Sequence, residues 1–195
     1  MIDTWPGREY HLPSKEIMSL GQRLINAGIA LAVCAVLIAF VYPLLHESGH
    51  TLAALACGGS ASGMDLALPS AHVHLSGSFT SAQMVLINIA GLALPLFVWA
   101  LFLVLVRKNA PPIVELVKLF SSAIVIGTLL PWLVIPFLVG RGKAPSGEDA
   151  TKVVIESGLP HWLFALIAAG LIAGAVALYI KKKSGLRRLF DRPFV

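Results

Sequence analysis

The sequence has 195 residues, of which 57% are hydrophobic and 13% are charged, and its mean hydropathy is +0.82. Soluble domains carry about 25% charged residues, so this composition excludes an ordinary water-soluble globule and indicates a membrane protein. The length suits a single domain spanning residues 1–195. Lys and Arg outnumber Asp and Glu by 15 to 10, an excess that a membrane protein gathers beside its spans, and no nucleic-acid partner is expected.

The N-terminal residues 1–23 are expected to form a tail that ends in an interfacial helix turn at Ser14–Arg23. The tail lacks a basic start followed directly by an apolar core, so no cleavable signal peptide is predicted and the first apolar helix is expected to direct targeting. Cys34 and Cys57 lie in apolar stretches, where a thiol behaves as a small hydrophobe. They therefore indicate no redox compartment.

Four apolar stretches are long enough to cross a bilayer, which takes about 20 residues as a helix. They predict an all-α polytopic membrane protein with about four transmembrane helices. The stretches are Leu24 to about Cys57, Ala82–Val106, Leu119–Gly140 and His161–Ile180.

The first stretch is longer than one straight crossing requires. Its roughly 34 residues would extend about 51 Å, against a hydrocarbon core of about 30 Å. Pro43 removes the hydrogen bond to the carbonyl of Ala39, so a kink is predicted there, with the polar residues that follow packed against protein rather than lipid. Pro131 and Pro136 predict a bend in the third stretch.

The connections between the stretches differ in character. Residues 58–81 are rich in Gly and Ser and alternate in polarity at Ala71–Leu75, which predicts a short β-like hairpin or re-entrant loop. Residues 107–112 contain two prolines that would end one helix and begin the next. The loop after the third stretch is expected to lead into a short helix from about Gly147 to Glu156, and residues 181–195 form a basic C-terminal tail.

Positive charges predict the orientation of the chain. With four spans, both termini and the second loop share one side of the membrane, and these segments hold most of the Lys and Arg residues near the spans. Because cationic segments stay in the cytoplasm, we expect an integral protein of the cell membrane with cytoplasmic termini. The end of the first span would then face outward.

His46-Glu47-Ser48-Gly49-His50 is an HExxH sequence inside the first apolar stretch. On a helix, a spacing of four residues places both imidazoles on one face, where they can hold one zinc ion. Zinc lowers the pKa of a water molecule, and Glu47 would accept its proton as the water attacks an amide carbonyl. Ionisable residues in an apolar run are costly and are normally retained for a function. The alternative is a set of interfacial polar residues at a helix end.

The segment HESGHTLAALACGG, with an apolar helix on each side, resembles the site-2 protease group of intramembrane zinc metalloproteases, the M50 peptidases, especially its short M50B-like members. The resemblance extends from about Ala39 to Leu166. It implies a zinc metalloendopeptidase that hydrolyses peptide bonds of membrane-embedded protein substrates in regulated proteolysis. Leu92 stands where the small-residue stretch of the family has a proline, and the longer NxxPxxPLDG signature is absent. Well-known members carry the metal nearer the cytosol, which conflicts with the orientation from charge.

The resemblance implies one Zn²⁺ per chain, with His46 and His50 as ligands, Glu47 as the general base and Asp149 as the third ligand. Topology agrees with this assignment, because two further crossings return the chain to the face where the HExxH lies. The alternative for Asp149 is a capping box with Ser146 as the N-cap.

Other acids and polar residues are weaker candidates for the site. Glu148 and Glu156 are reserve ligands, whereas Glu115 belongs to the opposite face. His72 and His74 would point the same way from a strand, where they can contact metal or substrate or be solvated. An extended strand there could also pair with a substrate made extended for cleavage. The remaining candidate for substrate contact, in the second span, is Asn88, for which packing is the alternative.

Two other functions compete with a protease. A catalytically inactive relative that binds a metal or a client would share these features and would differ in turnover. A transporter using His46, Glu47 and Asp149 as an ion relay would need polar residues at mid-depth on several helices. The second and third stretches offer only Asn88 and scattered Ser and Thr, which disfavours a transporter.

Overall fold

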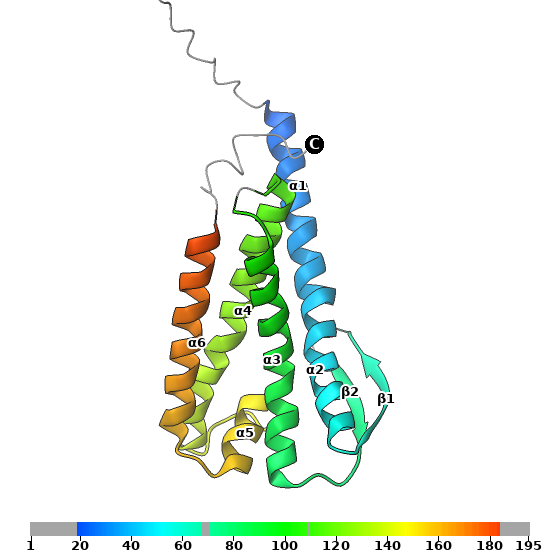
Figure 1. Cartoon of the computed structure of the whole chain (residues 1–195), viewed down its shortest axis with the longest axis vertical. Coiled ribbons are helices and arrows are strands. Elements are labelled where there is room, and N and C mark those ends of the chain that lie inside the picture. The colour runs from blue at the N-terminus through cyan, green and yellow to red at the C-terminus, as the bar shows by residue number, and fades with distance from the viewer. Residues whose placement is uncertain (1–18, 68–70, 109, 184–195) are drawn as a thin grey trace, which may run out of the picture.

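The computed structural model of the chain describes residues 19–67, 71–108 and 110–183. Within these residues, four helical segments are long and apolar enough to cross a membrane. They run side by side, with a two-stranded hairpin and a short helix gathered at one end (Figure 1). The prediction of an all-α polytopic membrane protein with a short β-like loop after its first span is therefore confirmed.

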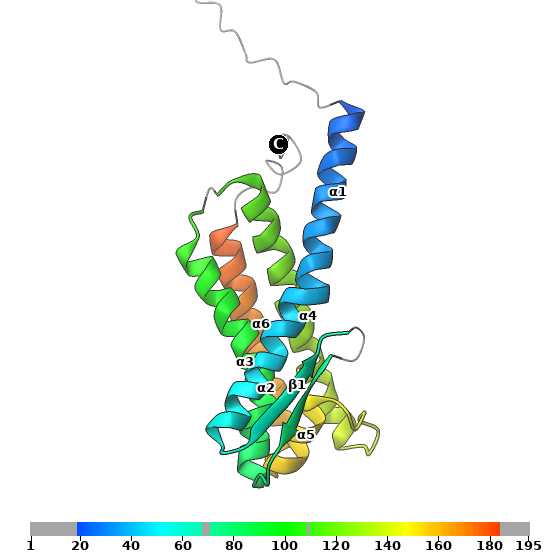
Figure 2. The ribbon, with the colours of Figure 1, turned by 90° about the vertical axis from the view of Figure 1, so that its right-hand side faces the viewer.

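The first span is one continuous helical rod from Leu20 to Ala56. Its parts are α1 (Leu20–Val36), the π-helical turn η1 (Leu37–Val41) and α2 (Tyr42–Ala56). The amide of Tyr42 donates to the carbonyl of Leu37, one residue beyond the usual α-helical partner, and this wider turn directly precedes Pro43. The rod changes direction here (Figure 2), so the kink predicted at Pro43 takes the form of a π turn.

The start of the first span differs from the prediction. The hydroxyl of Ser19 accepts a hydrogen bond from the amide of Gln22 and caps α1. Residues 14–18 of the expected interfacial turn lie outside the described residues. Leu20 to Arg23 belong to the spanning helix itself and not to a separate turn, because the cap at Ser19 starts the helix there.

The hairpin consists of β1 (Ser60–Asp65) and β2 (His72–Ser76), which pair antiparallel. A register shift interrupts the pairing on β1 between Ala61 and Gly63. Beside it, a Cβ on Gly59 would lie 2.5 Å from the ring of Phe79, so a larger residue there would have to displace this ring. The hairpin alternative predicted for this loop is the one observed.

Helices α3 (Ser81–Leu105) and α4 (Pro112–Val139) form the second and third spans. Thr80 and Gln83 make a reciprocal capping box at the start of α3. As predicted, the two prolines begin the next helix, with Pro111 as the N-cap of α4 and Pro112 as its first residue, but they do not end α3, which stops at Leu105.

The prediction that the third span begins at Leu119 is wrong, because α4 includes Glu115 and Lys118. These side chains are buried, and Lys118 Nζ lies 2.7 Å from Glu115 Oε1 and donates to the carbonyl of Arg107, also at 2.7 Å. Each charge compensates the other within the helix, which reduces the penalty of removing them from water. A span predicted from an uninterrupted run of apolar residues leaves out Glu115 and Lys118, because both are charged.

The last two helices are α5 (Asp149–Ser157) and α6 (His161–Lys182). The short α5 lies against α3 and α4 at one end of the bundle. Helix α6 packs on α4 around a buried apolar cluster that also includes α3. Its buried members are Leu92, Trp99, Leu103, Val125, Leu129 and Ala175. This three-helix scaffold supports the end of the bundle where α2, the hairpin and α5 meet.

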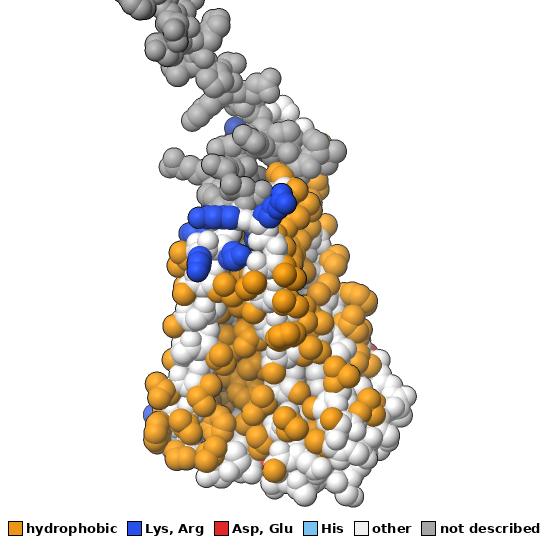
Figure 3. Space-filling model, in the orientation of Figure 1, with side chains coloured by type: hydrophobic (Ala, Val, Ile, Leu, Met, Phe, Trp, Pro, Cys, Tyr) orange, Lys and Arg blue, Asp and Glu red, His pale blue; other side chains and the backbone are white. Residues whose placement is uncertain are grey.

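Positive side chains gather at the opposite end, where α1 begins and α3 turns into α4 (Figure 3). Lys182 donates to the carbonyl of Val104 at 2.8 Å, which brings the end of α6 to the end of α3. Arg107 and Lys108 follow α3 at this same end. The cationic end and the HExxH end of the bundle are therefore opposed, as the charge argument requires.

The four-span topology predicts that Lys108 and Lys143 lie on opposite sides of the membrane, because one crossing, α4, separates them. In a chain with Cys34 and Cys57 replaced by Ala, we expect Lys143→Cys to react with a membrane-impermeant maleimide in intact cells and Lys108→Cys to react only after permeabilisation. Labelling of both from one side would contradict the four crossings. The reverse pattern would overturn the orientation alone.

The buried pair of Lys118 and Glu115 predicts a large single-mutant effect. Lys118→Met removes the ammonium from a buried carboxylate, so we expect the free energy of unfolding in detergent to fall by about 3–5 kcal/mol. The double variant Glu115→Gln, Lys118→Met should recover most of this loss, because no charge then remains buried. Equal losses in the single and double variants would show that packing, and not charge, governs the site.

Candidate metal centre

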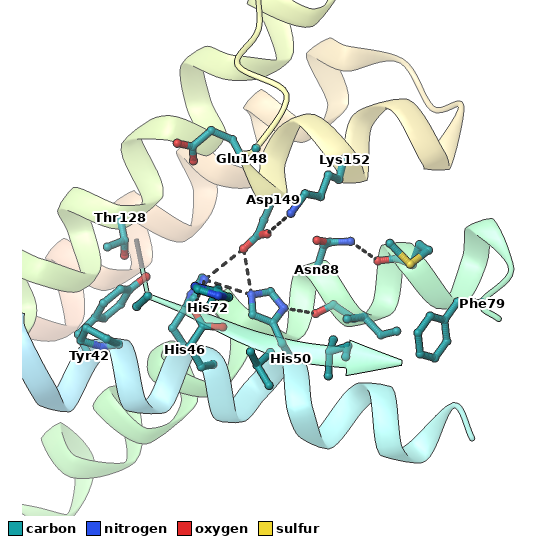
Figure 4. A pocket seen from close by; sticks show the side chains of 18 of the residues that line it. Tyr42, His46, His50, His72, Phe79, Asn88, Thr128, Glu148, Asp149 and Lys152 are labelled. Atoms are coloured by element: carbon teal, nitrogen blue, oxygen red, sulfur yellow. Dashed lines mark hydrogen bonds and ion pairs between the residues drawn. The ribbon is translucent and has the colours of Figure 1, made fainter. Parts of the chain in front are cut away.

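Three potential metal-binding atoms converge where α2 meets α5 (Figure 4). His46 Nε2 and His50 Nε2 are 3.1 Å apart, and each lies 3.1 Å from Asp149 Oδ2. The spacing of the histidines follows from one helical turn of α2. Asp149 arrives from a distant part of the chain, because α3 and α4 cross the bundle and return to the same end.

The spacing of these atoms fits a tetrahedral metal site. Two atoms bound to zinc at about 2.0–2.1 Å are about 3.3 Å apart in tetrahedral geometry, close to the 3.1 Å between each pair here. Two neutral imidazole nitrogens and a carboxylate oxygen all present lone pairs, which repel unless a proton or a cation lies between them. The donor set therefore fits a bound zinc ion.

The hydrogen bonding of the second ring nitrogen, Nδ1, determines which nitrogen of each histidine is available to a metal. His50 Nδ1 lies 2.8 Å from the carbonyl oxygen of Ile87. Because a carbonyl only accepts, Nδ1 carries a proton, so the ring in its neutral form would present the Nε2 lone pair to the cluster. His46 Nδ1 is buried and makes no hydrogen bond within the described part of the chain. The ring of Tyr42, one turn earlier, stacks on His46 with 5.8 Å between centroids.

Glu47 lies beside the histidines on α2. Its Oε1 is 4.0 Å from His46 Nε2, and only 4% of the residue is exposed. The side chain also lines the large cavity beside the cluster, called the main cavity below. Glu47 therefore lies beside the histidine nitrogens, whereas the two histidines also contact the carboxylate of Asp149.

Helices α2 and α3 touch closely beside the cluster. A Cβ on Gly49 would lie 2.1 Å from the carbonyl oxygen of Ala90, and a Cβ on Gly91 would lie 2.3 Å from His50 Nε2. Real Cβ atoms do not approach so closely, so both positions require glycine. Gly49, which lies between the two histidines in the sequence, and Gly91 on α3 together allow the imidazoles to lie directly against the α3 backbone.

Asp149 is the first residue of α5, and the capping-box alternative for it is wrong. The N-cap of α5 is Glu148, not Ser146, and no side chain caps the helix. Burial alone would raise the pKa of Asp149, but hydrogen bonds from His46 and His50 and their charge hold that pKa well below its ordinary value. The carboxyl group is therefore ionised at neutral pH.

A cavity of about 920 Å³ opens beside the cluster. It extends from Ile38 and Ile124, within the spans, to Lys152 on α5. Helices α2, α3, α4 and α5 and strand β2 all contribute to its walls. A volume near the upper end of the usual range for ligand pockets can accept several residues of a peptide.

The predicted substrate-contact residues lie in different places. His72 and His74 point the same way from β2, with ring centroids 4.7 Å apart, and His72 lines the cavity. His74 is exposed and is not part of the cavity wall. Asn88 is buried in the wall, where its amide donates to the carbonyl of Met84 in its own helix at 2.6 Å.

The reserve acids are separated from the histidines. Glu148 lines the main cavity, while Glu156 lines a smaller neighbouring cavity of about 320 Å³. Glu115 lies at the far end of α4, paired with Lys118, as the topology predicted. Of the acids on α4 and α5, Asp149 is the one whose carboxylate contacts both histidine nitrogens.

Sequence reasoning missed three polar residues of the cavity wall: Tyr42, Thr128 and Lys152. Tyr42 on α2 and Thr128 on α4 both line this cavity and lie near each other (Figure 4). Tyr42 precedes His46 by four residues and Lys152 follows Asp149 by three, so helical spacing could have placed both beside the predicted site. Thr128 carried no such signal, because its position depends on how α4 packs against α2.

Comparison with known proteins places the chain in a family. A family model described as Peptidase M50B-like matches residues 24–141, which is more than half of the chain and includes the HExxH sequence and the first three spans. Asp149 lies just beyond the matched region. Searches of curated proteins and of solved structures give no match. Four helices among the described residues are long and apolar enough to span a membrane, and the first carries the HExxH group. On the strength of the family match, the chain belongs to the M50B-like family of peptidases.

Proposed function

We propose that the protein is a zinc metalloendopeptidase that cleaves membrane-embedded protein substrates in the manner of regulated intramembrane proteolysis. The observation that carries this proposal is the mutual 3.1 Å spacing of His46 Nε2, His50 Nε2 and Asp149 Oδ2. These three atoms are the proposed zinc ligands, and Glu47 is the proposed general base. Membership of the M50B-like family supports the assignment.

The electrostatics of the cluster support a resident cation. Asp149 and Glu47 bring two carboxyl groups into a partly buried site, where negative charge is costly without a positive partner. A divalent cation would balance both carboxylates while leaving the imidazoles neutral. Hydrogen bonding of His50 Nδ1 to the carbonyl of Ile87 fixes the ring that would bind it.

Bound zinc would supply Lewis acidity, lowering the pKa of a water molecule and polarising the carbonyl under attack. Glu47, buried beside His46, would take a proton from that water as its oxygen bonds to the carbonyl carbon. The carbon–nitrogen bond then breaks, and Glu47 would return the proton to the leaving amine. The products are one new carboxyl group and one new amino group, and the base is regenerated.

The cavity supports an extended substrate that enters from the membrane. Its inner end, at Ile38 and Ile124, lies within spanning helices, so a lipid-embedded segment can reach the histidines. A helical substrate hides its scissile carbonyl in internal hydrogen bonds and must be unwound first. Strand β2 forms part of the wall and offers backbone groups to an unwound segment. His72, His74 and Asn88 remain candidates for contact with it.

Replacing the proposed base separates chemistry from metal binding. We expect Glu47→Gln to retain zinc and to lower kcat by about 10²- to 10⁴-fold, because the amide cannot accept a proton. The measurement is cleavage of a panel of reconstituted transmembrane peptides, with zinc content determined in parallel. Glu156→Gln serves as the matched control, because Glu156 lies outside the main cavity. Unchanged turnover in Glu47→Gln would disprove the proposed mechanism.

Zinc content tests the proposed ligand set. We expect detergent-purified parent protein to hold about one zinc ion per chain and Asp149→Ala to lose most of it, because only two ligands remain. Glu148→Ala and Glu156→Ala should retain the metal, which distinguishes the proposed ligand from the neighbouring acids on the same segment. A parent protein without zinc would contradict the proposal. Zinc without turnover of any peptide would instead favour a catalytically inactive metal- or client-binding relative.

A further inference from the structure

We propose that Lys152 is a positioning residue that restricts Asp149 to binding the metal through a single carboxylate oxygen. This inference rests on the proposed function, and it assigns a role to a residue that neither the HExxH sequence nor the third ligand accounts for. By occupying the second oxygen of Asp149, Lys152 keeps a coordination position available for water and substrate.

The two oxygens of Asp149 have different partners. Oδ2 faces the two histidine nitrogens at 3.1 Å each, whereas Oδ1 lies 3.4 Å from Lys152 Nζ (Figure 4). Across the described ranges, Asp149 Oδ1 is the one hydrogen-bond acceptor that Lys152 Nζ contacts. The carboxylate is thus held from both sides, with one oxygen toward the proposed metal position and the other turned away from it.

Local structure maintains this arrangement. Asp149 and Lys152 are three residues apart on α5, so one helical turn brings their side chains together. The amide of Lys152 donates to the carbonyl of Glu148 at 3.1 Å, and the neighbouring side chains of Ala150 and Val153 are buried. The ion pair is therefore attached to a helix that is itself anchored to the bundle.

The chemical argument concerns the number of ligand atoms. A carboxylate with two free oxygens can bind a metal through either one or both of them. A catalytic zinc site has three protein ligands and keeps the fourth position open for water. If both oxygens of Asp149 bound, the second would compete for that position. A hydrogen bond from an ammonium to Oδ1 disfavours this, because the outer partners of a ligand set its orientation.

Two other roles for Lys152 make different predictions. If its charge served only to offset the carboxylate, removing it would change metal affinity without changing the number of ligands. Because the side chain is 41% exposed and lines the cavity, it could instead contact the substrate. Removal would then raise KM while leaving the metal site unaltered.

Cobalt substitution distinguishes these roles, because four-coordinate Co²⁺ absorbs visible light more strongly than five-coordinate Co²⁺. We expect the full-length Lys152→Met protein, loaded with Co²⁺ in detergent, to lose absorption intensity relative to the parent. Its dissociation constant for the metal should not rise, because Asp149 Oδ1, released from Lys152, would add a further bond to the metal. Its kcat should fall by about 10- to 100-fold with KM unchanged.

Matched variants complete the experiment. Lys152→Arg retains a charged donor for Oδ1 and should keep the parent spectrum and most of the parent kcat. Lys143→Met makes the same charge change in the preceding loop, outside the cavity, and should match the parent throughout. A parent-like spectrum in Lys152→Met would overturn the inference, whether the affinity for metal or KM changed instead. A parent protein that binds no Co²⁺ would show that the proposed metalloprotease function itself is wrong.

Discussion

The close contact between α2 and α3 is the constraint on which the rest of the site depends. At Gly49 and Gly91 neither helix has a side chain, and the backbones approach to distances that no Cβ would allow. This approach brings His50 Nδ1 within hydrogen-bond distance of the carbonyl of Ile87, which orients the ring and presents Nε2 to Asp149. The orientation of the imidazole is thus a consequence of helix packing, and the histidines need no flexible loop to converge.

Within the described residues, two clusters of ionisable side chains lie in the helical bundle, and they differ in a way that separates structure from function. Lys118 and Glu115 are almost fully buried and compensate each other within one helix, next to the turn that joins α3 to α4. The histidine cluster also contains buried groups, but it borders a cavity of about 920 Å³ and brings several electron-pair donors together. Internal compensation explains the first cluster completely. Of the two clusters, the second is the one that faces space for a ligand.

The bundle also explains how a polar site can exist at the depth of a spanning helix. Helices α3, α4 and α6 share an apolar core, while α2 is held against α3 and leaves room beside α4 for the cavity. The π turn before Pro43 redirects the first rod at the inner end of this space. Pro43 itself is buried, and the carboxylates of Glu47 and Asp149 both border the cavity.

The sequence by itself determined the features that depend on local spacing. Runs of apolar residues predict the four spans, and the Gly-rich, alternating segment predicts the hairpin. The prolines predict the start of α4, and the four-residue interval places His46 and His50 on one face of a helix. Topological parity placed Asp149 at the correct end of the bundle. Only the tertiary structure decided that its carboxylate reaches both histidines, that Thr128 lines the same cavity as Tyr42, and that Lys118 and Glu115 enter a span. Local patterns report which face of one element is apolar or polar, whereas these contacts depend on how separate helices pack against one another.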